Sequence, residues 1–346
     1  MQIAQNIRRM LSSVSRTFRF TPSGEPVVEM VDETTAEKPA RKRRSKRFWL
    51  IVASIGFVVL LWPGIAFLLV HKINDDTALT ANGVDGGAAS VSITIFLMQR
   101  EVNQTGWTPN APWFMPAALL NNMPNFQIGV VKSLGRFAFE LEDQVGRERG
   151  SSAADADLEI ARARLQYDPT VWLVKPGTLW PTASAEDQYR EAITALKRYN
   201  ARLAKGEATF DARADNLMAV LNRIALDIGG MSAELDAQID NRHKTFGLLD
   251  MKADKIFYRV KGGTYAYFML LQALQTDFSD VIKERNTARL YDEMLLELRR
   301  AAVMQPLVVN NGTPSGQAFP NHLANQGFHL LRARTKMREI TDVLQK

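Results

Sequence analysis

The feature that most constrains this chain is an uninterrupted apolar run over residues 48–70, FWLIVASIGFVVLLWPGIAFLLV. With a rise of about 1.5 Å per residue, a helix over this run would be about 35 Å long. A bilayer core of about 30 Å needs about 20 apolar residues to cross it. We therefore expect a membrane-spanning helix. A cleaved signal peptide is the less favoured alternative, because the apolar part of such a peptide is usually only about 7–15 residues long.

A basic cluster, RKRRSKR, directly precedes this run. Lys and Arg close to a span are retained on the cytoplasmic side of a membrane. We therefore expect a single-pass protein with residues 1–47 in the cytoplasm and the remainder outside. Basic side chains near an anionic leaflet are also attracted to it, so membrane lipid is an expected partner. The residues that carry this orientation signal are Arg41, Lys42, Arg43, Arg44, Lys46 and Arg47.

The net charge of the chain, +6, comes from this cytoplasmic segment. Residues 1–47 hold 11 Lys and Arg against 5 Asp and Glu, so the remaining 299 residues hold 32 of each sign. A neutral domain lacks the basic surface by which proteins bind nucleic acid, so we expect no nucleic-acid partner. The chain has no cysteine, which excludes disulfides, thiol catalysis and cysteine-ligated zinc.

Two further segments flank the expected span. Residues 1–20 place apolar side chains at helical spacing between arginines, which favours either an amphipathic helix on the inner leaflet or a short helix that is mostly unfolded in water. Residues 21–47 are expected to form a disordered, basic tether. Residues 71–87 read as a polar linker, and residues 88–346 as one α-helical domain.

Helical periodicity dominates that domain and predicts an all-α fold, a single transmembrane helix followed by a multi-helix bundle. The alternation over residues 88–102 also suits a strand, but the polar residues that follow it favour a helix. Ser184 and Gly206 have the residue types that begin and end a helix. The pairs Gly229-Gly230 and Gly262-Gly263 are interpreted as helix breaks or kinks. The expected helices are 88–102, 116–121, 126–149, 155–167, 184–205, 209–239, 246–260, 263–286, 287–305 and 321–346.

Two proline-rich loops are rich in tryptophan: GWTPNAPWFMP, with Trp107 and Trp113, and VWLVKPGTLWP, with Trp172 and Trp180. Tryptophans of this kind could fill the end of a bundle, bind a partner protein, or stack on the sugar rings of a glycan. Packing is the favoured interpretation, and the other two stay open. The candidate partner- or glycan-binding residues are Trp107, Trp113, Asn121, Trp172 and Trp180.

Few residues suggest chemistry. Glu140 and Asp143 are neighbours on one expected helix and could act as an acid–base pair, but Arg136 and Arg147 favour ion pairs within that helix. His322 and His329 share a helix face, yet too few acidic residues lie near them in sequence to complete a metal site. The chain has no nucleophile elbow, phosphate loop or dinucleotide fingerprint. We therefore expect no enzyme activity, no cofactor and no metal.

Three long stretches resemble the DUF2333 family, proteobacterial proteins of unknown function. They are REVNQTGWTPNAPWFMPAALLNNMPNFQIGVVKSLGRFAFELEDQVGRERGSS, PTASAEDQYREAITALKRYNARLAKGEATFDARADNLMAVLNRIALDIG and VKGGTYAYFMLLQALQTDF. The resemblance covers most of the chain beyond the expected span and supplies no catalytic residues. It implies an inner-membrane protein of a Gram-negative bacterium with its domain in the periplasm, and it favours the helix over residues 88–102.

These observations predict a membrane-anchored periplasmic scaffold or accessory subunit that docks another envelope protein. Homo-oligomers are a further open possibility. The alternative is a module that binds or acts on peptidoglycan glycan through the aromatic loops, with Glu140 or Asp143 as acid–base groups. A catalytic site requires these acids to line a cleft together with the loop tryptophans. A scaffold instead requires an exposed apolar patch.

Overall fold

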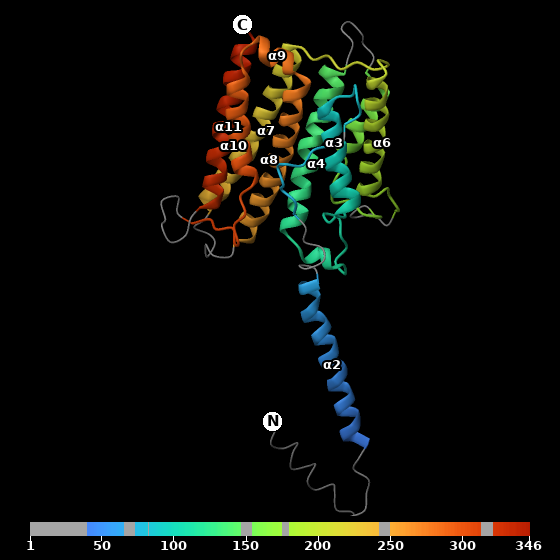
Figure 1. Cartoon of the computed structure of the whole chain (residues 1–346). Coiled ribbons are helices and arrows are strands. Elements are labelled where there is room, and N and C mark those ends of the chain that lie inside the picture. The colour runs from blue at the N-terminus through green and yellow to red at the C-terminus, as the bar shows by residue number, and fades with distance from the viewer. Residues whose placement is uncertain are drawn as a thin grey trace, which may run out of the picture. The chain divides into compact units, whose positions relative to one another are not determined.

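The structure is a computed structural model that describes residues 40–65, 73–81, 83–146, 154–174, 180–241, 250–312 and 321–346 (Figure 1). It divides the chain into two compact units, residues 1–59 and residues 60–346. The predicted amphipathic helix 1–20 and residues 21–39 of the predicted tether lie outside the described residues. So do residues 66–70, the last five of the apolar run, and residues 71–72.

The first described element is helix α2, Ala40–Ile65. It begins directly after Pro39, so residues 40–47 are helical and the prediction of a disordered tether was wrong for them. The physical reason is that Lys and Arg are good helix formers and can extend an apolar helix that follows them. Among the residues that the structure describes, no helix has the length and apolar content needed to cross a membrane.

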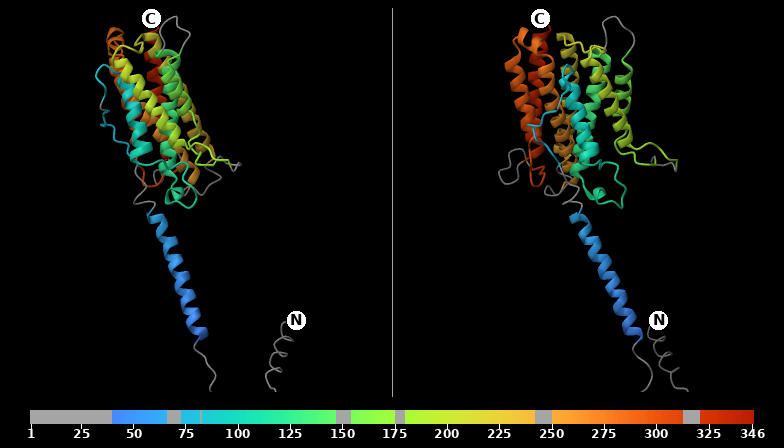
Figure 2. Two further views of the ribbon diagram at one scale, coloured as in Figure 1. Left: turned by 90° about the vertical axis from the view of Figure 1, so that its right-hand side faces the viewer. Right: turned by 45° about the vertical axis from the view of Figure 1, so that its right-hand side comes forward.

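The described residues from 73 onward form the all-α bundle that periodicity predicts (Figures 1 and 2). The described residues contain no strand, only the isolated bridges Val174–Pro181 and Asn311–Asn321. Two helices end in a π-helical turn, Arg100–Gln104 after α3 and Leu141–Val145 after α4, and Pro116–Leu119 is a 3₁₀ turn. The helices are α3 (Ala89–Gln99), α4 (Asn122–Glu140), α5 (Ala156–Leu165), α6 (Ala185–Ala204), α7 (Ala214–Asp240), α8 (Met251–Asp277), α9 (Ser279–Glu284), α10 (Ala288–Ala302) and α11 (His322–Leu344).

One end of this bundle, which we call the base, gathers the ends of α3, α5, α7 and α10 and the starts of α4, α6, α8 and α11 (Figure 1). Side-chain hydrogen bonds tie these ends together. Asn311 Nδ2 donates to the carbonyl of Gln238 at the end of α7, and Gln238 Nε2 donates to Asp250, which caps α8. The base therefore brings together loops from distant parts of the sequence.

Glycines allow α4 and α8 to pack backbone against backbone. A Cβ atom on Gly262 would lie 2.0 Å from the carbonyl oxygen of Phe126, and one on Gly129 would lie 2.0 Å from that of Arg259. Gly262 and Gly263 lie inside one continuous helix, so the predicted break was wrong, and α8 replaces most of the two predicted helices 246–260 and 263–286. The missing side chain is used for close approach and not for a change in backbone direction.

Helix α7 likewise continues through Gly229 and Gly230 without a break. A Cβ atom on Gly229 would lie 3.0 Å from the guanidinium carbon of Arg334 in α11, while one on Gly230 would meet nothing within 4 Å. Of the two alternatives predicted for this pair, a kink or a break, the break was therefore wrong. Gly229 leaves space for the arginine, and Gly230 has no packing neighbour.

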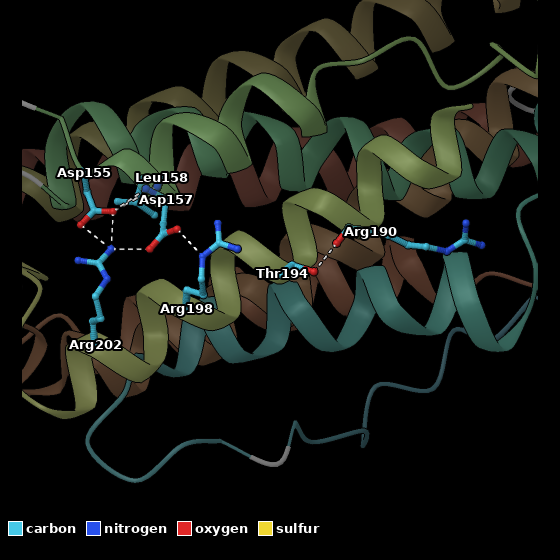
Figure 3. Close-up of polar contacts among 7 residues, drawn as sticks. All are labelled: Asp155, Asp157, Leu158, Arg190, Thr194, Arg198 and Arg202. Carbon is cyan, nitrogen blue, oxygen red and sulfur yellow. Dashed lines mark hydrogen bonds and ion pairs between the residues drawn. The ribbon is translucent and has the colours of Figure 1, made fainter. Parts of the chain in front are cut away.

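The predicted boundaries of α6 are confirmed. Ser184 Oγ accepts from the backbone N–H of Asp187 at 3.2 Å and caps the helix, and Gly206 with φ +73° follows its end. At the opposite end from the base, ion pairs join α6 to α5 (Figure 3). Arg202 donates to both Asp155, the N-cap of α5, and Asp157, and Arg198 donates to Asp157.

The segment predicted as a polar linker, 71–87, is largely part of the domain. The side chains of Ile73, Leu79 and Ala81 pack against the core. Lys261, whose side chain is 1% exposed, donates to Asp75 Oδ2 at 2.6 Å and to the carbonyl of Met304 at 2.6 Å. The linker prediction was wrong for residues 73–81, because Asp75 pairs with a lysine 186 positions away that the local sequence does not reveal.

Candidate functional site: an aromatic edge at the base of the bundle

The two aromatic loops meet at the base. Trp107 Nε1 donates to the carbonyl of Pro169 at 3.0 Å. Asn110 Nδ2 donates to the carbonyl of Val171 at 3.0 Å and to Glu186 Oε2 at 2.5 Å. The first loop is thus attached to the second loop and to the first turn of α6. Both loops form one continuous surface.

Trp107 packs inside this surface. Its side chain is only 8% exposed and its ring lies edge-on to Tyr189, with 5.0 Å between ring centroids. Trp107 therefore packs within the domain, as the favoured interpretation of these tryptophans predicts. The prediction of Trp107 as a binding residue was wrong, because its side chain is buried and its N–H already donates within the domain.

Trp113 and Trp180 are instead 87% and 79% exposed. The Phe114 ring links the loops, with its centroid 5.9 Å from that of Trp113 and 6.2 Å from that of half-buried Trp172. Asn121 is half-buried at the end of the first loop. We call the exposed surface the aromatic edge, and it consists of Trp113, Phe114, Met115, Leu119, Trp172, Leu173, Val174 and Trp180. Contiguous apolar surface of this kind marks an interaction site.

A buried polar network holds the edge from below. Arg100 Nη2 pairs with Glu101 Oε1 at 2.7 Å, and both side chains are buried. Gln127 in α4 donates to Glu101 Oε2 at 3.2 Å and accepts from the backbone N–H and hydroxyl of Thr108 at 3.0 and 2.7 Å. Every bond satisfies a group that would otherwise be buried without a partner. The network therefore fixes the first loop in one conformation.

The same network reaches the start of the domain. Arg100 Nη1 donates to the hydroxyl of Tyr265, and this hydroxyl donates to the carbonyl of Asp76, each at 2.9 Å. Burial raises the pKa of Tyr265, so the phenol stays protonated and able to donate. Sequence reasoning missed this network, because adjacent Arg and Glu in REVNQ look like the polar end of a helix.

Asp254, near the start of α8, gives a pH-dependent prediction. Burial raises the pKa of this carboxyl to about 6 from its ordinary value of 3.8. The folded state then binds more protons than the unfolded state between these values, so the free energy of unfolding falls as pH rises from 3.8 to about 6. We expect Asp254→Asn to raise the free energy of unfolding at pH 7 by about 1–2 kcal/mol and to change it little at pH 3.5.

Urea unfolding at both pH values measures this, with exposed Asp236→Asn as the control. An equal effect of Asp254→Asn at the two pH values would contradict the assignment.

The acids of α4 take structural roles. Buried Glu140 accepts from Arg223 of α7 at 2.7 Å, Arg136 pairs with Asp227 at 3.6 Å, and Gln144 donates to Asp143. The predicted ion pair between Glu140 and Arg136 was wrong, because partners on α7 lie closer, and Arg147 lies outside the described residues. Glu140 is 13 residues beyond Gln127, about 20 Å along the helix. The acids therefore do not share a cleft with the loop tryptophans.

The histidines are also engaged. His322 Nδ1 accepts from the backbone N–H of Asn310 at 3.0 Å, and His329 Nδ1 lies 2.7 Å from Glu297 Oε2 of α10. Glu297 is the acidic neighbour that the sequence around His329 does not show. Within the described ranges, no group of three or more potential metal ligands comes together.

A second exposed apolar surface lies between α10 and α11, and we call it the α10–α11 groove. Leu296, Phe328 and Leu331 are exposed there, and the Arg332 guanidinium lies 5.5 Å from the centroid of the Phe328 ring. Glu297 pairs with Arg300 at 2.9 Å and with Arg332 at 3.2 Å. The adjoining cavity has a volume of about 240 Å³. Unlike the aromatic edge, this surface mixes apolar and charged side chains.

Comparison with known proteins gives a family but no function. No curated protein and no solved structure matches the chain. A family model described as an uncharacterised protein conserved in bacteria, DUF2333, matches residues 69–346, and the chain therefore belongs to the DUF2333 family, as its sequence resemblance predicts.

Proposed function

We propose that this protein is a non-enzymatic scaffold of the bacterial inner membrane. Residues 48–70 anchor it, the basic cluster before them stays in the cytoplasm, and the helical domain lies in the periplasm, where it docks another envelope protein. The anchor confines the domain to one plane and thereby raises its effective concentration for partners in the same membrane.

The observation that carries this proposal is that groups of apolar side chains are exposed on the domain, among them the aromatic edge and the α10–α11 groove. The acids and histidines singled out as chemical candidates are engaged in structural contacts instead. We assign the partner protein to the α10–α11 groove. Its apolar side chains surrounded by arginines and glutamates correspond to the apolar core and polar rim of protein interfaces.

The glycan alternative has less support. Stacking on sugars needs exposed ring faces together with available amide donors. Trp107 is buried, and the Asn110 amide is used by Val171 and Glu186. Trp113 and Trp180 remain exposed.

Crosslinking in intact cells, followed by affinity purification and mass spectrometry, tests the proposal. We expect a specific partner whose yield falls at least about tenfold in Phe328→Ala/Leu331→Ala, because losing two apolar contacts from an interface weakens it by about 2 kcal/mol or more. The matched control is Leu226→Ala, an exposed apolar residue of α7.

A partner retained by the groove variant but lost from Trp113→Ala/Trp180→Ala would move the docking surface to the aromatic edge. Enrichment of peptidoglycan fragments, with no protein partner, would favour the glycan alternative.

A further inference from the structure

We propose that the aromatic edge rests in the interfacial region of the bilayer that the chain's own apolar segment enters, so that the domain contacts the membrane a second time. This inference rests on the proposed anchor. The evidence comes from the chemistry of the edge, from its position relative to the start of the domain, and from its rigidity.

The chemistry of the edge suits a lipid interface. Residues 106–122, 171–174 and 180–184 contain no Lys, Arg, Asp or Glu. Their most exposed large hydrophobic side chains are Trp113 and Trp180, and tryptophan is enriched at the headgroup level of a bilayer. A protein-docking surface such as the α10–α11 groove has charged groups around its apolar centre. The described residues of the edge itself are uncharged, and the neighbouring Glu186 is bonded to Asn110 of the first loop.

The position of the edge follows from how the chain enters the domain. Asp75 is held by Gln305, three residues past the end of α10, and by Lys261, ten residues into α8, and it lies five residues after Val70. Five residues of fully extended chain span at most about 18 Å. Chain length alone therefore keeps Asp75 within about 18 Å of the end of the apolar run.

Hydrogen bonds connect Asp75 and Asp76, which we call the attachment point, to the loops that form the edge. They run from the Asp76 carbonyl through Tyr265, Arg100, Glu101 and Gln127 to Thr108 in the first aromatic loop. The first aromatic loop is thus joined through the interior of the bundle to the segment that follows the apolar run. The base also exposes Met251, Val303, Leu307 and Val308, and a membrane-facing end would bury these side chains as well.

The edge is also preorganised. Trp107 and Asn110 attach the first loop to the second, and Gln127 fixes it to α4. Seating such a surface on a bilayer needs little ordering of the chain, which otherwise reduces binding strength. The buried area of apolar side chains then adds directly to the attachment supplied by the span.

Single-cysteine labelling tests this inference, because the chain has no native cysteine. The full-length protein is reconstituted into phosphatidylethanolamine–phosphatidylglycerol vesicles, with an environment-sensitive fluorophore on Leu119→Cys or Leu173→Cys. Leu226→Cys, exposed on α7, is the matched control, and Val58→Cys reports on the anchor. Quenching is measured with aqueous iodide and with lipids spin-labelled at a shallow depth for the domain probes and deep in the acyl chain for the Val58 probe.

We expect the two edge probes to be quenched at least threefold more by the spin-labelled lipid than the Leu226 probe, and less by iodide. Edge probes that behave like the Leu226 probe would overturn the inference while leaving the anchor intact. Edge probes shielded from iodide only in native membranes, and not in pure lipid vesicles, would identify a protein occupant and would also overturn it. Absence of lipid quenching at Val58 would overturn the proposed anchor itself.

Discussion

Gly262→Ala is expected to lower the free energy of unfolding of the domain by about 3 kcal/mol or more, an unusually large loss for one added methyl group. The new Cβ atom would lie 2.0 Å from the Phe126 carbonyl oxygen and 2.8 Å from its carbonyl carbon. These are backbone atoms of another helix, so no side-chain rotation relieves the clash. The two helices must separate, and the apolar contacts beside the crossing are then lost.

Chemical denaturation followed by circular dichroism measures this effect. The matched control is Gly230→Ala, also inside a long helix but with nothing within 4 Å of the added Cβ. We expect this control to stabilise the protein by up to about 1 kcal/mol, because alanine has a higher helix propensity than glycine. Similar effects of the two variants would show that the α4–α8 crossing does not depend on the missing side chain.

Arg100→Met is expected to cost about 3–5 kcal/mol of stability, because it leaves the Glu101 carboxylate buried without its cation. The pair lies beneath the aromatic loops, so the loss also frees the hydrogen bonds that hold Gln127 and Thr108 in place. We expect the first aromatic loop to become mobile, and with it the exposed Trp113.

The double variant Arg100→Met/Glu101→Met distinguishes two effects. One is the cost of leaving the Glu101 carboxylate buried without a cation, and the other is the loss of the ion-pair attraction itself. Replacement of a whole buried ion pair by apolar residues of similar volume is often close to neutral. We therefore expect the double variant to recover at least about half of the stability lost in the single variant. A double variant less stable than Arg100→Met would mean that Glu101 contributes through its bond to Gln127 and not through the charge pair.

Most of the helices could be predicted from the sequence, because local patterns determine them. The Ser184 cap and Gly206 mark both ends of α6 before any tertiary contact is considered. Local sequence patterns could not show the role of the glycine pairs. A glycine that interrupts a helix and one that admits a neighbouring backbone look alike in sequence, and only the position of Phe126 beside Gly262 distinguishes them.

The candidate site was only partly predictable. The tryptophan-rich loops identify the region, but the contact between Trp107 and Pro169 depends on α4 and α5 returning the chain to the base. The sequence also could not show that Trp107 is buried while Trp113 is exposed. Both occur in one loop among similar neighbours, and only the tertiary contact with the second loop distinguishes them. One signal was present and unused: the absence of charged side chains over residues 106–122 distinguishes this loop from most surface loops.

The close crossing of α4 and α8 also bears on the order in which this domain folds. Its two sides, Gly129 and Gly262, are separated by more than one hundred residues, so the contact cannot form until most of the domain has been synthesised. Contacts between such distant segments slow folding, and they leave apolar helix faces exposed in the meantime. We therefore expect this protein to depend most on molecular chaperones while only its N-terminal half has been synthesised.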